Sequence, residues 1–346
     1  MKLFSYKGID LIKFICALFV VMIHINPFVC IGFFINDFFV NFLARFAVPF
    51  FLVTTGYFFF KKLEFENGKL LNIKENRSIV FKTVKRLLIL YVLWSLIYLL
   101  LWQIRYWISI DWTGVKAIKD YLHAFFYSGS VYHFWYFVNV IYGIIFLVLL
   151  LKILGIRKTM YISFGYYIFS KVLDITCFLS VFELPSTINL ILDILSKFLS
   201  ISPFLMIGLL YSKYQDKLIQ KINHKQLIGM FILYLIEFSI LRLIKYDELS
   251  GSYIITMPFL MICIFCYILK IKINESKINY KFFRETSTII YCVHPLYIYL
   301  LNEHLWFLNL NSILQYILVV SFSIITSFFI IKISKIKVFS KLKYLY

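Results

Sequence analysis

This chain of 346 residues is 62% hydrophobic and 21% aromatic, and only 15% of its residues are charged. Apolar runs recur along its whole length, so it is an integral membrane protein rather than a soluble globular one. The formal net charge of +19 does not indicate nucleic-acid binding, because the basic residues are gathered in alternate loops between apolar segments.

Ten apolar segments are long enough to cross a membrane as helices. They cover residues 9–31, 38–60, 87–108, 132–151, 160–181, 190–211, 227–245, 253–269, 286–306 and 313–333. We therefore expect an all-α integral membrane protein of about ten transmembrane helices, forming one membrane domain over residues 1–346 with no separate soluble domain. The first segment has no small-residue cleavage site, so we expect it to be retained rather than removed as a signal peptide.

Lysine and arginine alternate between the two sides of the predicted membrane. The loops after the even-numbered segments are rich in both residues, whereas the stretches 32–40, 182–189 and 302–312 contain none. Both termini should therefore be cytoplasmic. The same basic clusters favour contact with anionic membrane lipids.

The first segment carries a cation, a carboxylate and an imidazole on one helical face. Lys13 and His24 are eleven positions apart, and eleven steps of about 100° return to within about 20° of the start while rising about 16 Å. Asp10 falls on the same face. Ionisable groups inside a membrane helix are costly unless they face a protein interior or a watery cavity, so this face is a candidate functional site.

Arg45 opens the second segment, and two interpretations of it are open. A long basic side chain near a helix end can extend to the outer interface and serve no other purpose. The alternative is a fixed cation near the mouth of a cavity, where it contacts a substrate.

The fourth segment begins with an imidazole and an indole close together, at His133 and Trp135. Trp135 is explained by the aromatic belt that many membrane proteins have at the interface. His133 has no such general explanation, so we take both as candidate substrate-binding residues.

Two further ionisable residues lie inside predicted helices. Glu237 falls in the middle of the seventh segment, where an unpaired carboxylate is expensive. His294 precedes Pro295 in the ninth segment, where it either forms a hydrogen bond within the bundle or contributes to a site. We take Glu237 and His294 as candidate substrate-binding residues as well.

The cysteines do not indicate a metal centre. All six lie in apolar segments, and the pair Cys263 and Cys266 has neither a second pair nor a nearby histidine. We expect no metal cofactor.

In these motifs, the chain resembles the acyltransferase-3 family of multi-span membrane acyltransferases from about Tyr6 to Ser334. The most specific part is Asp10-x-x-Lys13, followed after ten intervening residues by His24. The strings at 45–57, 133–136, 204–208 and 290–294 follow in the family's order. Within the family, the first two segments are most similar to the membrane portions of serine racemases linked to vancomycin resistance.

The sequence departs from the family pattern where the third segment begins. The family usually has two arginines three positions apart; here Arg86 matches the second, and Thr83 stands at the first. Lys82 and Lys85 are the nearest other cations, although a lysine is a point charge rather than a bidentate fork.

The resemblance implies transfer of an acyl group, commonly acetyl, from a cytoplasmic acyl-CoA to a hydroxyl of an envelope glycan or related lipid-linked acceptor, in the bacterial cytoplasmic membrane. His24 is then the base or the acyl-accepting residue, because a neutral imidazole can take a proton near physiological pH. Lys13 contacts the thioester or a phosphate, and Asp10 orients Lys13.

In the same hypothesis Arg86, with Lys82 and Lys85, binds the phosphates of acetyl-CoA or another acyl-CoA. The transfer is completed within the membrane domain or passed to a separate extracytoplasmic transferase. The alternative function is a transporter or flippase-like protein, in which the same polar face moves a small amino acid or a lipid-linked sugar without covalent chemistry.

Overall fold

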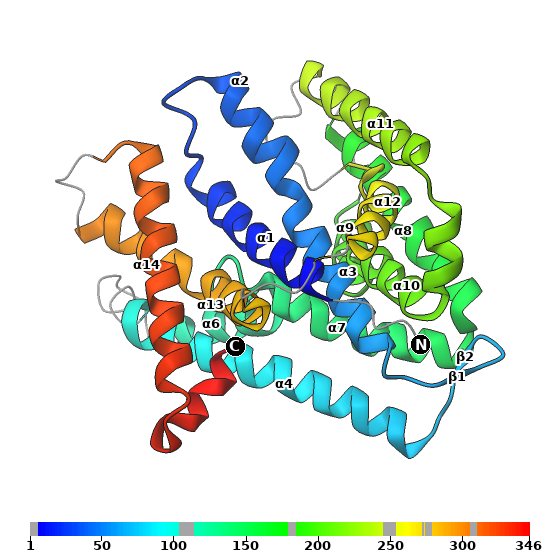
Figure 1. Ribbon diagram of the computed structural model, residues 1–346, viewed down its shortest axis with the longest axis horizontal. Helices are drawn as coiled ribbons and strands as arrows, with labels where there is room; N and C mark the ends of the chain where they lie inside the picture. Colours follow the sequence, from blue (N-terminus) through cyan, green and yellow to red (C-terminus); the bar gives the residue numbers. More distant parts are fainter. Residues whose placement is uncertain are drawn as a thin grey trace. The chain divides into compact units, whose positions relative to one another are not determined.

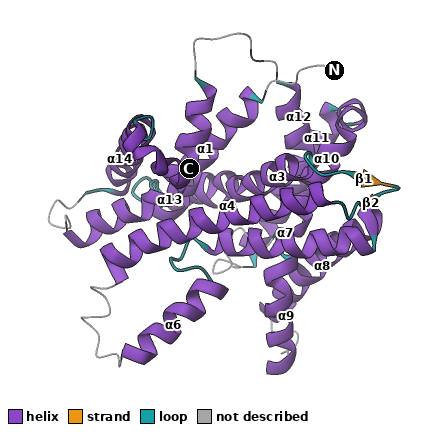
Figure 2. Ribbon diagram, turned by 90° about the horizontal axis from the view of Figure 1, so that it is seen from below, coloured by secondary structure: helices purple, strands orange, loops and turns teal. Residues whose placement is uncertain are grey.

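A computed structural model of the chain describes residues 6–103, 114–178, 185–244, 254–271, 273, 279–304 and 310–346. These residues are mostly helical (Figures 1 and 2). A short antiparallel hairpin pairs β1 (Phe65–Glu66) with β2 (Lys69–Leu70). The chain separates into two units, of which the first comprises Met1–Phe58 and Phe204–Tyr344 and the second comprises Phe59–Pro203. Each unit is described by itself.

The first unit holds the helices from both ends of the chain. They are α1 (Lys7–Ile25), α2 (Phe33–Asn36), the π-helix η1 (Asp37–Leu43), the 3-10 turn η2 (Ala44–Phe46), α3 (Ala47–Phe60), α10 (Ser202–Lys221), α11 (His224–Leu243), α12 (Met257–Lys270), α13 (Tyr280–Tyr299), η4 (Leu300–His304), α14 (Ser312–Ile333) and η6 (Lys337–Leu345).

The second unit holds the helices from the middle of the chain. They are α4 (Lys74–Tyr98) with its π-helical continuation η3 (Leu99–Gln103), α6 (Gly114–Tyr127), α7 (Trp135–Ile153), α8 (Gly155–Phe178) and α9 (Ser186–Leu199).

The described residues of the ten predicted segments are mostly helical, so the all-α prediction is confirmed. The sixth segment, 190–211, is not one helix, because it is divided between α9 and α10 at Ser200 and Ile201. Among the described residues, seven helices are long and apolar enough to cross a membrane, and α12 is a shorter apolar helix. The helices α8 and α13, in the fifth and ninth predicted segments, are not among the seven. The count of ten spans and the cytoplasmic position of both termini stay predictions.

Two predicted boundaries were wrong. The first helix ends at Ile25, not at residue 31, because Asn26 adopts the left-handed conformation with φ 54° and Pro27 follows it. An asparagine in that conformation commonly ends a helix, and a following proline cannot continue it. The third helix begins at Lys74, well before residue 87. Its first half is helical but polar, so apolar content did not reveal it.

Contacts define the relative directions of three helices of the first unit, α1, α13 and α14. Phe14 of α1 stacks on Phe283 of α13 with ring centroids 5.0 Å apart, and further along both helices His24 stacks on His294. These two helices are therefore parallel. After η4, α14 runs back along α13, with Gln315 donating a hydrogen bond to Asn302. Parallel α1 and α13 with an antiparallel α14 is the arrangement expected of first, ninth and tenth spans.

Two glycines let α3 and α10 approach closely. A Cβ at Gly56 would lie 2.9 Å from the Cα of Leu205, and a Cβ at Gly208 would lie 2.7 Å from the carbonyl carbon of Gly56. Small residues at such crossings are typical of membrane helices. Next to the crossing, the Tyr57 hydroxyl donates to Gln215 Oε1 at 2.7 Å.

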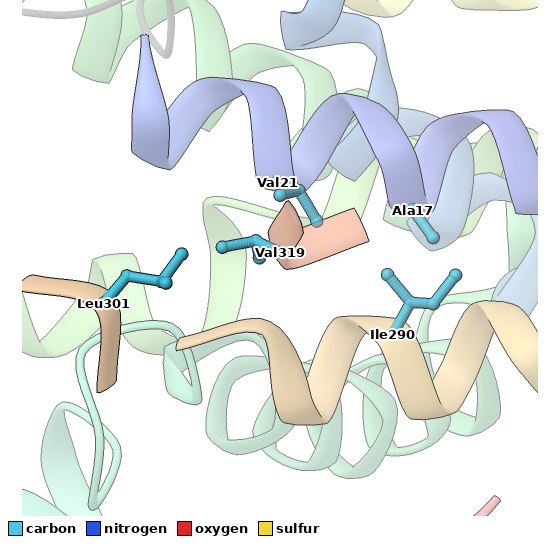
Figure 3. Close-up of a cluster of buried hydrophobic side chains, with 5 residues drawn as sticks. All are labelled: Ala17, Val21, Ile290, Leu301 and Val319. Carbon is cyan, nitrogen blue, oxygen red and sulfur yellow. The ribbon is translucent and has the colours of Figure 1, made fainter. Parts of the chain in front are cut away.

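A small apolar cluster holds the parallel helices against α14. Ala17 and Val21 of α1 face Ile290 of α13, and Leu301 and Val319 complete the cluster (Figure 3). All five side chains are buried. This packing fixes the register of α1 on α13 and therefore places the polar residues of the two helices side by side.

Candidate functional site

The principal candidate site is a pair of stacked imidazoles near the C-terminal ends of two parallel helices. His24 of α1 and His294 of α13, which we call the histidine pair, have ring centroids 5.3 Å apart and an interplanar angle of 23°. His294 is fully buried, and His24 is half-buried. The sequence singled out both residues, but nothing in their spacing indicated that they meet.

Carbonyl groups of α13 determine which nitrogen of His294 carries the hydrogen. His294 Nδ1 lies 3.0 Å from the Ile290 carbonyl oxygen, which can only accept a hydrogen bond. In the neutral ring Nδ1 therefore carries the hydrogen, and the lone pair is on Nε2. Pro295 has no N–H, so it leaves the Tyr291 carbonyl without its usual helical donor, and that carbonyl also interacts with the His294 ring.

Arg45 is a cation that acts electrostatically on His24 of the histidine pair. It lies in η2, within electrostatic range of His24. Its Nη2 donates to Asn41 Oδ1 at 3.1 Å, and Asn41 Nδ2 donates to Asp37 Oδ1 at 2.8 Å. Asp37 in turn forms an ion pair with Arg242 of α11. The Arg45 side chain is thus held by a hydrogen bond within the protein, and Asn41 connects it to the carboxylate that pairs with Arg242.

The π-helix η1 supports this arrangement. Asp37, Asn41 and Arg45 follow one another at intervals of four residues, through η1 and into η2. Single-turn π-helices are rare and occur frequently at functional sites. Among the described residues Arg45 Nε has no hydrogen-bond partner, so one donor of this guanidinium is not committed to the protein.

A second polar cluster lies near the N-terminal ends of the same two helices. Asp10 Oδ2 is 3.6 Å from Arg284 Nη1 on α13, and the carboxylate is also within electrostatic range of Lys13. The Asp10 side chain is 7% exposed, whereas that of Arg284 is 47% exposed. We call Asp10, Lys13 and Arg284 the ionic cluster.

Arg284 was not predicted from the sequence to be a site residue. Its position among the loop cations indicated only a role in membrane topology. A signal was present, because Arg284 precedes His294 on α13 much as Lys13 precedes His24 on α1. Each helix therefore carries a cation near its start and an imidazole near its end.

Glu237 has a structural partner that the sequence did not predict. Its Oε1 accepts the Ile255 N–H at 2.6 Å, and its Oε2 accepts the Thr256 N–H at 2.9 Å and the Thr256 hydroxyl at 2.6 Å. These are groups at the start of α12, where backbone donors have no intrahelical acceptor. Glu237 thus caps α12 and connects it to α11.

His133 and Trp135 lie at the start of α7 in the second unit. His133 is buried, with its ring 4.1 Å from that of Phe134 and 5.9 Å from that of Tyr98. Trp135 is the first residue of α7 and is 37% exposed. The indole is accessible, whereas the imidazole is surrounded by aromatic rings.

Lys82, Lys85 and Arg86 are exposed residues of α4. Their spacing of three and four places them on one side of the helix. The Lys85 ammonium lies 5.9 Å from the Phe81 ring centroid. This basic face of α4 is in the second unit, and the histidine pair and the ionic cluster are in the first.

The first unit thus contains the elements of a proton-transfer site. A neutral imidazole can accept a proton and return it, and a guanidinium can stabilise negative charge that develops on an oxygen. Along α1, a cation and a carboxylate lie at one end and the imidazole lies about 16 Å away at the other. Such an arrangement suits a substrate that carries negative charge at one end and reacts at the other.

Comparison with known proteins identifies similar sequences. A family model described as an acyltransferase domain matches residues 6–332. An amino-acid racemase of Enterococcus faecalis is 25% identical over 337 residues, which is 92% of this chain and 45% of the racemase. A serine/alanine racemase of Enterococcus gallinarum is 30% identical over 162 residues, which is 47% of this chain and 22% of that protein.

The chain spans less than half the length of these curated relatives. No solved structure gives a significant match.

Proposed function

This chain belongs to the acyltransferase-3 family, and on that premise we propose that it is an O-acyltransferase of the bacterial cytoplasmic membrane. The donor is a cytoplasmic acyl-CoA, commonly acetyl-CoA. The acceptor is a hydroxyl of an envelope glycan or of a related lipid-linked molecule. The observation that carries the proposal is the histidine pair beside Arg45, at the opposite end of α1 from the ionic cluster.

The histidine pair supplies the proton chemistry. In direct transfer, His24 takes the proton from the acceptor hydroxyl as its oxygen attacks the thioester carbonyl. The carbon–sulfur bond then breaks, and the imidazolium returns the proton to the departing CoA sulfur. In a two-step route the His24 nitrogen attacks the thioester carbonyl, the carbon–sulfur bond breaks, and CoA leaves as the thiol with the proton of the imidazole N–H. The acceptor hydroxyl then attacks the acyl-imidazole, the carbon–nitrogen bond breaks, and the hydroxyl proton returns to the imidazole. In either route, His294 stacks on the His24 ring and restricts its movement.

Arg45 stabilises the negative charge that forms on the carbonyl oxygen during transfer. That oxygen becomes an oxyanion in the tetrahedral intermediate, and a positioned guanidinium donor stabilises it more than it stabilises the neutral carbonyl. The hydrogen-bonded residues Asn41 and Asp37 hold Arg45, so little reorganisation is needed during the reaction.

The donor binds through cations. Lys13, oriented by Asp10 and accompanied by Arg284, contacts the thioester or a phosphate of acyl-CoA. In the second unit, the exposed cations Arg86, Lys82 and Lys85 are a separate candidate surface for acyl-CoA phosphates.

Trp135 contacts the acceptor, because an exposed indole can stack on a sugar face, and the buried His133 beside it supports that surface rather than contacting the acceptor. Glu237 acts through α12, which it caps, rather than by contact with the acceptor.

The test uses purified protein and acetyl-CoA labelled in its acetyl group. Label that stays on the denatured protein shows the two-step route, and label that appears only on an added glycan shows direct transfer. If neither is seen with any envelope acceptor, and the labelled donor does not bind, the acyl-CoA proposal is wrong.

The second candidate is transport of a small amino acid, for which the specific observation is the relatives' own names, amino-acid racemase and serine/alanine racemase. Proteoliposomes that accumulate labelled serine without acyl-CoA would favour it. Uptake that survives His24→Ala would show that the histidine pair has no part in that transport.

A further inference from the structure

The second unit contains an open pocket of about 300 Å³ between α4 and α7, beside the β1–β2 hairpin. Val80, Phe81 and Val84 of α4 form one wall, and Ile145 and Val148 of α7 form the other. The proposed acyl transfer assigns no role to these residues.

The pocket continues the contact between α4 and α7. Further along α4, Tyr91 packs against Phe134 and Phe137 with ring centroids 5.9 Å and 6.1 Å apart. Toward the start of α4 the side chains become smaller, and valines face α7 in place of tyrosine. Aromatic rings therefore fill the α4–α7 interface near Tyr91, and an apolar groove is left between the two helices near Val80 and Val84.

Two cations complete the lining. Arg77 and Lys152 lie at the pocket together with the apolar side chains, and none of the residues that line it is acidic. Arg77 Nε donates to Asn72 Oδ1 at 3.2 Å, which restrains the guanidinium. The other polar lining residue, Asn76, is occupied, because its Nδ2 donates to the carbonyls of Glu64 and Leu71 at 3.0 and 2.8 Å.

We propose that this groove binds one anionic phospholipid. An acyl chain lies along the valines and Phe81, and the phosphate pairs with Arg77 and Lys152. Hydrocarbon suits the apolar walls, because Phe81 is 66% exposed and an acyl chain lying on it would remove apolar surface from water. Basic pockets between membrane helices recognise anionic headgroups by the same charge complementarity.

The groove is distinct from the basic face of α4. Arg77, Val80, Phe81 and Val84 are spaced three and four residues apart, so they share one side of the helix. The groove side is centred about 140° around the helix from the basic face, at about 100° per residue. The lipid proposal therefore stands whether or not the basic face binds acyl-CoA.

Lipid binding can be measured on delipidated protein in neutral detergent. The probes are dioleoyl-phosphatidylglycerol, dioleoyl-phosphatidylcholine and oleoyl-CoA, titrated separately. We expect the anionic lipid to bind at one site per chain and about 30-fold more tightly than the zwitterionic lipid with the same acyl chains, since each cation near a lipid surface is worth about a factor of five.

Variants locate the site. Arg77→Gln with Lys152→Gln should lower the affinity for phosphatidylglycerol to that for phosphatidylcholine. The control pair Lys74→Gln with Lys158→Gln removes the same charge from exposed residues outside the groove and should leave the affinity unchanged. Val80→Phe keeps both cations but fills the groove, and it should weaken binding of both lipids.

Unchanged affinity in both the charge variant and Val80→Phe would overturn the proposal. Should the charge variant not fold, Val80→Phe decides alone. Oleoyl-CoA that displaces phosphatidylglycerol and binds more tightly would also overturn it, by showing that the groove belongs to a donor.

Discussion

At the scale of single residues, packing against His294 restricts the position of His24, the proposed base. The His24 ring lies against that of His294, whose Nδ1 is held by the Ile290 carbonyl. Because His294 is buried and its Nδ1 contacts its own helix, its ring has few alternative positions. Stacking against this ring thereby restricts the orientation of the His24 imidazole toward a substrate.

His24→Ala should lower acyl transfer by about 10² to 10⁴-fold, the usual contribution of a positioned acid–base group. The measurement is labelled acetyl transfer by purified protein. His224→Ala is the matched control, because His224 is an exposed residue at the start of α11 and should leave the rate unchanged. Full activity of His24→Ala, with the control also active, would remove His24 from the mechanism.

Lys13→Arg should retain more activity than Lys13→Met. Both replacements are long enough to fill the position, but only arginine keeps a permanent cation beside Asp10 and Arg284. Binding of acetyl-CoA is the readout, and the methionine variant should bind it more weakly. Equal binding by Lys13→Met and the parent would assign Lys13 to topology instead of donor contact.

At the scale of helices, the α1–α13 and α3–α10 pairs pack through different kinds of residue. The parallel pair α1 and α13 is held by Ala17, Val21 and Ile290 of the apolar cluster (Figure 3). The α3–α10 crossing uses glycines instead, so that backbone meets backbone. The glycine of the 204–208 string therefore has a packing role, and so does the glycine of the 45–57 string.

Gly208→Ala should destabilise the protein by about 1–3 kcal/mol, since the new methyl group would overlap the α3 backbone. Gly229→Ala is the control. Gly229 is also inside a helix, but a Cβ there meets nothing within 4 Å, so alanine should be neutral or stabilise by up to about 1 kcal/mol. Thermal unfolding in detergent compares the two, and equal midpoints would contradict the close crossing.

At the scale of the whole molecule, sequence charge and helix direction can be compared within the first unit. The alternation of lysine-rich and lysine-poor loops requires the first and ninth spans to run the same way and the tenth to run back. The contacts of α1, α13 and α14 have those directions. Direction says nothing about which side is cytoplasmic, so the side itself needs an experiment.

Reporter fusions after Asn311 and after Lys343 should lie on opposite sides of the membrane, with the second in the cytoplasm. The reason is that Lys332 ends the last span and Lys335, Lys337, Lys341 and Lys343 follow it, whereas residues 302–312 contain no lysine or arginine. A periplasmic phosphatase fusion and a cytoplasmic fluorescent fusion at each site give the answer. The same side for both fusions would show that α14 does not cross.

The sequence by itself indicated that the protein lies in a membrane, that it is helical, where most of the apolar helices lie, and which helical face carries Asp10, Lys13 and His24. Those properties depend on composition and on one helical period, which are local. Only the tertiary structure showed that His294 meets His24, that Arg284 meets Asp10 and that Glu237 caps α12. Each of these contacts joins helices distant in sequence or separated by a loop. The register between two helices is set by the apolar residues packed between them, and no local pattern encodes it.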